Sequence, residues 1–336
     1  MQGKVRLVVY GGRLKGIALG GHLWLSKISK ELASYDDLTV EHVEEPSVGS
    51  NRLRNIVNAY VKGFMVLVKH PDAILVSAGK DGSAAIGLLH KFISRSSRIY
   101  TIVYHYEPVA IGKHSKISYI LAKILRDTTF KLNKDLLNQS TAIFTLSNAS
   151  KKSISEILSI PRGKIFVTGN GRLELPYSPP GLKRDVHFLC VGRFGKFMFL
   201  DNIWKEIRRL NKDAVLYMAG IGESDPRVSR LYSIGNFKHK GIVTEETKTS
   251  FFKRSKVFIF PSAFEGFGIA VAEALGFGLP VVVWDLLVYR EIWCETKAIR
   301  RVGFSEYAKF AREAVYALEN FEALSAEARN HSSWYP

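Results

Sequence analysis

From Phe260 to Val283 the chain reads FPSAFEGFGIAVAEALGFGLPVVV, and this stretch decides the fold expected for the second half of the protein. The apolar run that ends at Phe260 predicts a buried strand, and the run that begins at Leu279 predicts another. Gly266 and Gly268 mark a turn, and the pattern after Gly268 predicts a short helix. A strand, a glycine-rich turn, a helix and a second strand are typical of a parallel α/β layer.

Two carboxylates lie in this stretch, Glu265 before the turn and Glu273 on the second turn of the expected helix. The first N–H groups of a helix lack partners and the helix dipole is positive there, so the bare backbone around Gly268 favours an anion. The two carboxylates can face the same ligand and hold its hydroxyl groups. The stretch therefore predicts a site for a phosphate-bearing ligand such as a nucleotide sugar.

Apolar runs alternate with helical patterns along almost the whole chain, which predicts parallel α/β layers throughout. In the first half the expected strands are Val5–Tyr10, Leu38–Val43, Ala73–Ser77, Ile99–Tyr104, Ala142–Leu146 and Ile165–Thr168. In the second half they are Val186–Val191, Ala214–Ala219, Lys256–Phe260 and Leu279–Trp284.

Asn-Gly and Pro-Pro-Gly turn signals separate the two halves, and no periodic pattern crosses them. We expect a first domain at residues 1–172, a linker at 173–184 and a second domain at 185–336. Both domains are expected to be doubly wound α/β folds of the Rossmann type. Their strand ends would then face a central cleft, where a ligand should bind.

The chain has 336 residues, 46% of them hydrophobic, which is enough for two domains with their own cores. Its formal net charge of +17 attracts polyanions: nucleic acid, an anionic membrane or phosphorylated substrates. A solvated basic surface without a dedicated partner explains the same charge. The two cysteines, Cys190 and Cys294, are too few for a disulfide framework, and we expect reduced structural thiols.

The first residues, MQGKVR, run directly into Leu7–Tyr10 without the apolar region and cleavage site of a signal peptide. No apolar run approaches the about 18 residues of a membrane span. We expect a cytoplasmic protein. The basic, amphipathic segment 115–138 could lie on an anionic membrane surface, or its apolar stripe could face the core.

Three further groups of residues are candidates for contact with a ligand. Gly20 and Gly21 precede a helix and allow close approach of a substrate to the backbone, although an ordinary tight turn explains them equally. Arg193 and Lys196 follow the first strand of the second half and could hold a diphosphate, or could be surface charges. His105 follows another strand and could hydrogen-bond a sugar hydroxyl. The sequence contains no spacing of ligands typical of a metal site.

Together these residues resemble the GT-B-fold retaining glycosyltransferases of the family "glycosyl transferases group 1". The segment Glu265–Glu273 is similar to the Glu-x7-Glu signature of that family, and Gly276–Val282 (GFGLPVV) is similar to the stretch after it. Thr145–Ser150 (TLSNAS) resembles a segment that leads to the family's linker, and Val191–Arg193 resembles the start of its second domain.

The resemblance implies an acceptor-side first domain and a second domain that binds the nucleotide sugar. It places Glu273 at the ribose hydroxyls, and Glu265 and His105 at the transferring sugar as catalytic residues. Arg193 and a lysine would hold the diphosphate. The substrate-binding residues implied are Gly20, Gly21, Arg193, Lys196, Gly266, Phe267, Gly268, Ile269 and Glu273.

The sequence departs from the family pattern at two places in this site. The family lysine usually stands five residues past the arginine, where this chain has Met198, and Lys196 comes two positions earlier. The glycine pair usual after the Val281–Asp285 strand is replaced by Leu287 and Val288.

We therefore expect a hexosyltransferase-type glycosyltransferase that works with retention and without a metal or a cofactor. The donor would be a UDP-, GDP- or ADP-sugar, and the acceptor a glycan or a lipid phosphate, with peripheral contact to an anionic membrane. Two alternatives remain open. One is a glycosyltransferase directed at nucleic acid, and the other is a non-catalytic family member that binds nucleic acid through its basic surface.

Overall fold

The structure is a computed structural model, and it describes most of the chain. The described residues are 4–11, 20–43, 61, 64, 68, 70–78, 83–104, 116–170, 181–192, 197–220 and 226–332. For residues 20–24, 83, 85, 116–126, 226, 331 and 332 it describes only the backbone. The chain divides into two compact units, residues 1–170 and 171–336.

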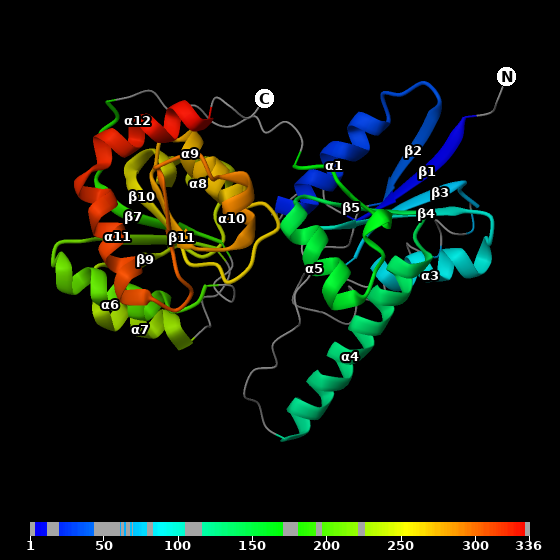
Figure 1. Ribbon diagram of the computed structural model, residues 1–336, viewed down its shortest axis with the longest axis horizontal. Coiled ribbons are helices and arrows are strands. Elements are labelled where there is room, and N and C mark those ends of the chain that lie inside the picture. Colours follow the sequence, from blue (N-terminus) through cyan, green and yellow to red (C-terminus); the bar gives the residue numbers. More distant parts are fainter. Residues whose placement is uncertain are drawn as a thin grey trace. The chain divides into compact units, whose positions relative to one another are not determined.

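The first unit contains one parallel sheet with strands in the order β2-β1-β3-β4-β5-β6 (Figure 1). Its strands are β1 (Val5–Tyr10), β2 (Leu38–Val43), β3 (Ala73–Ser77), β4 (Arg98–Val103), β5 (Ala142–Thr145) and β6 (Ile165–Val167). Its helices are α1 (Gly20–Leu32), α3 (Ser83–Ile93), α4 (Lys116–Gln139), α5 (Asn148–Leu158) and the short 3-10 helix η1 (Arg162–Lys164).

A hydrophobic core lies on one face of this sheet. Side chains alternate between the two faces of a strand, so every second residue, such as Val8, Tyr10, Ile74 and Val76, contributes to the same face. Helices α3, α4 and α5 cover this face with residues such as Leu136. The apolar runs seen in the sequence thus form strands because both faces of a parallel sheet are covered.

The second unit contains a parallel sheet in the order β12-β11-β10-β7-β8-β9. Its strands are β7 (Val186–Val191), β8 (Leu216–Ala219), β9 (Phe237–His239), β10 (Ser255–Phe260), β11 (Val281–Trp284) and β12 (Ile299–Val302). Its helices are α6 (Leu200–Leu210), α7 (Pro226–Ile234), α8 (Glu245–Arg254), α9 (Ile269–Gly276), α10 (Leu287–Ile292), α11 (Tyr307–Glu319) and α12 (Phe321–Ser332). Helix α6 contacts α7 and α11, and α9 contacts α12 (Figure 1).

Large aromatic side chains fill the core of the second unit. The Trp284 ring lies 4.8 Å from the Phe310 ring between centroids, and Phe188 and Trp204 pack edge to face at 6.2 Å. Helix α6 buries Leu200, Ile203, Trp204 and Ile207 at a helical spacing, so it presents one apolar stripe to the sheet.

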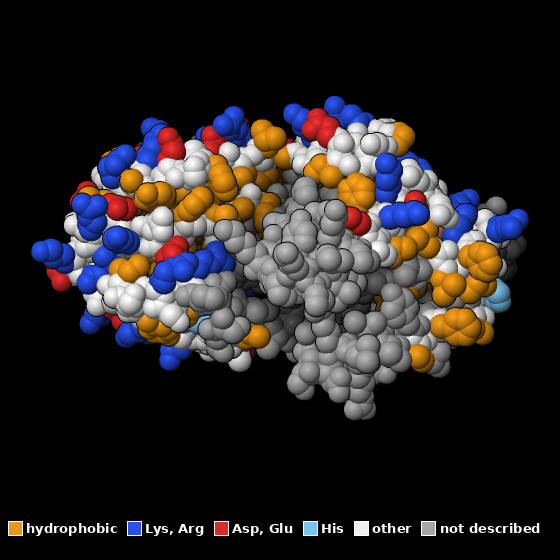
Figure 2. Space-filling view, turned by 90° about the horizontal axis from the view of Figure 1, so that it is seen from below, with side chains coloured by type: hydrophobic (Ala, Val, Ile, Leu, Met, Phe, Trp, Pro, Cys, Tyr) orange, Lys and Arg blue, Asp and Glu red, His pale blue; other side chains and the backbone are white. Residues whose placement is uncertain are grey.

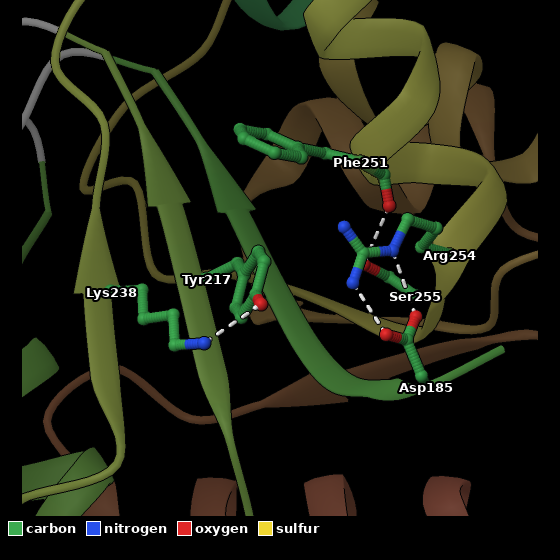
Figure 3. A network of polar contacts seen from close by, with 6 residues as sticks. All are labelled: Asp185, Tyr217, Lys238, Phe251, Arg254 and Ser255. Atoms are coloured by element: carbon green, nitrogen blue, oxygen red, sulfur yellow. Dashed lines mark hydrogen bonds and ion pairs between the residues drawn. The ribbon is translucent and has the colours of Figure 1, made fainter.

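The C-terminal end of α8 is fastened to the sheet by a polar cluster (Figure 3). Arg254 forms an ion pair with Asp185 and lies over the Tyr217 ring at 5.7 Å, while Lys238 lies over the same ring at 5.2 Å. Phe251 packs edge to face on that ring at 5.7 Å. The cluster joins the C-terminal end of α8 to β8 and to Asp185, the residue before β7.

These observations confirm the prediction of two doubly wound, Rossmann-like α/β domains. The sequence analysis did not include β9 and β12, the two edge strands of the second sheet. The expected linker 173–184 lies largely outside the described residues, and the central cleft stays a prediction. Of the helices that the structure describes, none combines the length and the apolar character that a membrane span requires.

Candidate active site

The loop between β10 and α9 lies at the topological switch point of the second sheet. Chain order runs outward in both directions from the neighbouring strands β7 and β10. In open parallel sheets, ligands bind beyond the carboxyl ends of the strands at such a point. An antiparallel bridge between Phe197 and Ser262 joins the loops that follow these two strands. Phe197 directly follows Lys196 in the sequence, and Ser262 lies three residues before Glu265.

Helix α9 begins without a side-chain cap. Its N-cap residue is Gly268, at φ 94° and ψ 52°, a left-handed conformation that favours glycine. A Cβ atom at this position would lie 2.9 Å from Cε1 of Tyr289, so the site also lacks space for a side chain. The Gly268 carbonyl accepts from the N–H groups of Val271 and Ala272. The bare helix start predicted from the sequence is therefore present, with the geometry that favours an anion.

Glu265 is held by a serine on its own loop. The Ser262 hydroxyl donates to Oε1 of Glu265 over 2.8 Å, and Ser262 is itself fully buried. Two tryptophan indoles tether the loop, because Trp284 donates to the Pro261 carbonyl and Trp293 to the Phe267 carbonyl. The half-buried Glu265 carboxylate thus lies on a well-supported turn.

Glu273 is paired with a lysine from a different helix. Lys248 on α8 places its Nζ atom 2.9 Å from Oε1 of Glu273 and 2.8 Å from Oε2 of Glu245. Burial raises the pKa of the Glu273 carboxyl, and Lys248 opposes that rise. Burial lowers the pKa of Lys248, but Glu273 and Glu245 more than offset this effect, so the lysine pKa is raised. The sequence analysis did not single out Lys248.

Tyr289 on α10 has a buried hydroxyl without a hydrogen-bond partner among the described residues. The residue is completely buried, and its ring contacts the position of Gly268. Burial, and then the nearby Glu265 carboxylate, raise the pKa of the Tyr289 phenol well above its usual range. A buried polar group without a partner is rare in native proteins. Here it lies beside both the helix start and the first glutamate.

The other predicted site residues are placed as follows. Gly266, Phe267 and Gly268 are buried, and Ile269 is the first residue of α9. Gly20 and Gly21 are the first two residues of α1, in the other unit. His105, Arg193 and Lys196 lie outside the described residues. The structure therefore adds three side chains that the sequence analysis missed: Ser262 at Glu265, Lys248 at Glu273 and Tyr289 at Gly268.

The sequence gives little indication that these three side chains belong to the site. Lys248 follows Glu245 and Glu246 on a helix start, a pattern typical of a solvated helix face. Ser262 and Tyr289 lie in apolar surroundings that indicate only burial. Within the described part of the chain there is no group of three or more His, Cys, Asp or Glu side chains arranged to hold a metal ion.

Comparison with known proteins finds similarity to glycosyltransferases. Residues 185–320 match the family described as "Glycosyl transferases group 1". The chain is 24% identical over 235 residues to an uncharacterized glycosyltransferase of Methanocaldococcus jannaschii, a match that covers 57% of this chain and 60% of the relative. It is also 24% identical over 271 residues to the O-antigen chain mannosyltransferase RfbU of Salmonella typhimurium, covering 78% of this chain and 71% of that protein.

A solved structure shares the architecture of both units. HepE of Anabaena, solved in complex with UDP-glucose, is similar with a TM-score of 0.69 and 14% sequence identity, over 98% of this chain and 95% of that chain. At this identity the likeness concerns the fold. The second unit thus matches a model of the group 1 glycosyltransferases over residues 185–320, and the architecture of the chain is that of the GT-B fold.

Proposed function

We propose that the protein is a retaining glycosyltransferase that moves a sugar from a nucleotide diphosphate to an acceptor hydroxyl. The observation that carries the proposal is the position of the β10–α9 turn. Glu265 and Glu273 lie on either side of an uncapped helix start at the switch point of a sheet, within residues that match the group 1 glycosyltransferases. An anionic ligand with hydroxyl groups suits this arrangement.

In this proposal the donor lies along the turn. The ribose hydroxyls donate to Glu273, the phosphates bind the backbone from Gly266 to Ile269, and Glu265 lies by the sugar. Arg193 and Lys196 supply positive charge for the diphosphate, and Gly20, Gly21 and His105 are the further substrate-site residues that the resemblance implies. The support is the resemblance of the motifs, together with the geometry described for the residues of the turn.

The reaction breaks the bond between the anomeric carbon and the diphosphate oxygen, and the leaving diphosphate takes the electron pair. The acceptor oxygen forms its new bond on the same face of the sugar, and its proton passes to the departing phosphate oxygen. Glu265 stabilises positive charge that develops on the sugar ring. The helix start and the basic residues stabilise the diphosphate, so the protein itself supplies the charge that a metal would otherwise bring.

The acceptor is proposed to be a glycan or a lipid-linked phosphate. Residues 1–170 carry 24 Lys and Arg against 12 Asp and Glu, so this unit holds most of the net positive charge. Lys and Arg side chains are also widespread on the face shown in Figure 2. Such a surface favours an anionic acceptor or the anionic leaflet of a membrane, and it fits a cytoplasmic protein at the membrane surface. Vesicle flotation at low and high salt separates a lipid acceptor from a soluble one.

A donor screen tests the function. Wild type and Glu265→Gln are incubated with UDP-, GDP- and ADP-sugars, and released nucleotide and transferred sugar are followed by mass spectrometry. We expect turnover of one donor class by wild type and its loss in Glu265→Gln, with nucleotide binding retained. Glu319→Gln, which changes an exposed carboxylate at the end of α11, is the control and should turn over normally.

The same screen decides against the alternatives. If wild type neither turns over nor binds any donor, and instead binds DNA in a salt-sensitive manner, the protein is a nucleic-acid-binding member of the family and the enzyme proposal fails. If donor turnover requires nucleic acid as acceptor, the transferase stands and the glycan or lipid acceptor is wrong.

A further inference from the structure

Lys248 is an unusually buried lysine, and both of its ion-pair partners are glutamates. Its side chain is 18% exposed, compared with 24% for Glu273 and 69% for Glu245. Lysine is almost never fully buried unless it is paired, and most of the Lys248 side chain is covered. Glu245 is the exposed partner on the same helix, whereas Glu273 is the partner that belongs to the candidate active site.

The pairing uses only one oxygen of the Glu273 carboxylate. Lys248 donates to Oε1 over 2.9 Å. The hydrogen bond and ion pair of Glu273 among the described residues both use Oε1, and an ionised carboxylate can accept bonds on both oxygens. The lysine therefore orients the carboxylate while one acceptor oxygen remains free for a ligand.

The position of Lys248 is set by restraints at both ends of α8. At the start, the Thr244 side chain caps the helix by accepting from the Thr247 N–H over 3.3 Å. At the end, the cluster around Arg254 and Tyr217 ties the helix to the sheet (Figure 3). A lysine held in this way loses less conformational freedom when it orients a neighbour than a lysine on a mobile surface.

We propose that Lys248 is a positioning residue of the donor site, which orients Glu273 so that its second oxygen accepts hydrogen bonds from the ribose hydroxyls of the nucleotide. This role rests on the proposed function, in which Glu273 binds the ribose. Lys248 itself does not touch the reacting atoms. Its effect is therefore on nucleotide affinity and not on the chemical step.

The electrostatics predict a signature in the pH dependence of binding. Only the ionised carboxylate accepts from both hydroxyls, so affinity falls as the pH decreases through the pKa of Glu273. Burial raises that pKa and Lys248 limits the rise, so loss of the lysine moves the acid limb of the binding profile to higher pH. The charged groups that act on Glu273 are Lys248 and Glu245, both from α8, while Arg329 of α12 lies close to the position of Gly278, two residues past the end of α9.

Isothermal titration with UDP, GDP and ADP between pH 5.5 and 8.5 tests the proposal. Lys248→Met should weaken the affinity for the tightest-binding nucleotide about 10- to 100-fold, as expected for loss of a charged hydrogen bond of about 1.5–3 kcal/mol. It should also move the acid limb of the binding profile to higher pH. Lys248→Arg should restore most of the affinity. Lys253→Met removes the same charge from an exposed position on α8 and should bind like wild type.

A nucleotide without ribose hydroxyls separates positioning from a general structural effect. The 2′,3′-dideoxy form of the best nucleotide should bind wild type weakly, and Lys248→Met should weaken it no further. Lys248→Gln keeps a donor without the charge and provides a second variant, with folding checked by circular dichroism.

The possible outcomes distinguish the two proposals. If wild type binds a nucleotide and the lysine variants retain its affinity and pH profile, the role of Lys248 is overturned and the donor site stands. An equal loss for ribose and dideoxy nucleotides likewise overturns the positioning role. If wild type binds none of the three nucleotides, the proposed function fails and this role fails with it.

Discussion

The hydroxyl of Ser262 donates a 2.8 Å hydrogen bond to Oε1 of Glu265, which joins a fully buried serine to the first glutamate of the candidate active site. The same hydroxyl also contacts the Phe264 carbonyl at 3.0 Å, so the carboxylate and its loop share one anchor. The bridge from Ser262 to Phe197 extends this anchor to the loop after β7.

Ser262→Ala should lower the turnover number of sugar transfer about tenfold and leave the KM for the donor nearly unchanged. A hydrogen bond to a carboxylate contributes about 1.5 kcal/mol, and its loss allows Glu265 to leave the orientation that the reaction requires. Steady-state kinetics with the donor found in the screen measures the two parameters separately.

Ser325→Ala is the matched control, because Ser325 is equally buried and donates to the Gly278 carbonyl at the opposite end of α9. It should reduce thermal stability to a similar extent and leave turnover intact. Equal turnover in both variants would show that Ser262 has no part in placing Glu265.

Gly268→Ala should destabilise the protein and remove donor binding. The left-handed φ of 94° costs a non-glycine residue about 1–2 kcal/mol, and the new Cβ would also lie 2.9 Å from Tyr289 Cε1. Urea unfolding gives the stability change, and titration with the nucleotide gives the binding change.

Gly235→Ala isolates the backbone contribution, since Gly235 has φ 88° and open space around the new Cβ. We expect the free energy of unfolding of this control to fall by about 1 kcal/mol and its affinity for the nucleotide to equal that of wild type. If Gly268→Ala destabilises the protein no more than Gly235→Ala does, then the Tyr289 ring moves away from the new Cβ without a loss of stability.

Tyr289→Phe should raise the unfolding free energy by about 1 kcal/mol or more, because it removes a buried hydroxyl that has no partner among the residues the structure describes. Thermal and urea unfolding measure this change. Tyr217→Phe removes a hydroxyl that does have a partner, Lys238 at 3.2 Å, and should not stabilise the protein. A stability loss in Tyr289→Phe would mean that the hydroxyl has a partner in solution.

Arg184→Met should destabilise the second unit by about 3 kcal/mol. The guanidinium donates to the carbonyls of Phe252, Ser255 and Phe277, and the variant would remove one donor from each of these carbonyls. Burial lowers the pKa of Arg184 to about 10, so the group remains protonated at neutral pH. Arg209→Met, at a residue whose side chain is 71% exposed, should change stability by less than about 0.5 kcal/mol in the same assay.

Because of His90, the free energy of unfolding of the first unit should decrease as the pH falls below about 6.5. Burial, followed by Lys91 and His70, lowers the pKa of His90 in the folded protein, and its ring contacts the Ser97 hydroxyl. The unfolded chain therefore binds more protons over the range between the folded pKa and about 6.5, and stability rises with pH there.

The contribution of His90 is measured as the difference in pH dependence between wild type and His90→Gln, by urea unfolding at pH 5, 6 and 7. For each unit by which the pH falls, the free energy of unfolding of wild type should decrease by up to about 1.4 kcal/mol more than that of the variant. Parallel profiles would show that the histidine titrates alike in the folded and unfolded states.

By itself, the sequence determined the α/β class and the turn before α9. Strands covered on both faces are continuous apolar runs, as in β7 and β10, and Gly268 marks a backbone conformation that other residues adopt at a cost. These features are local, because each depends on neighbouring residues in the chain. The edge strands β9 and β12 were missed, since β9 has only three residues and β12 contains Arg300 and Arg301.

Tertiary structure alone decided which side chains surround the two glutamates. Lys248 reaches Glu273 across 25 positions of sequence because α8 and α9 pack on the same sheet, and no periodic pattern records that distance. Tyr289 lies at Gly268 only because α10 follows the neighbouring strand β11. The sequence thus identifies the carboxylates and the helix start, whereas the packing of distant helices sets their charge and orientation.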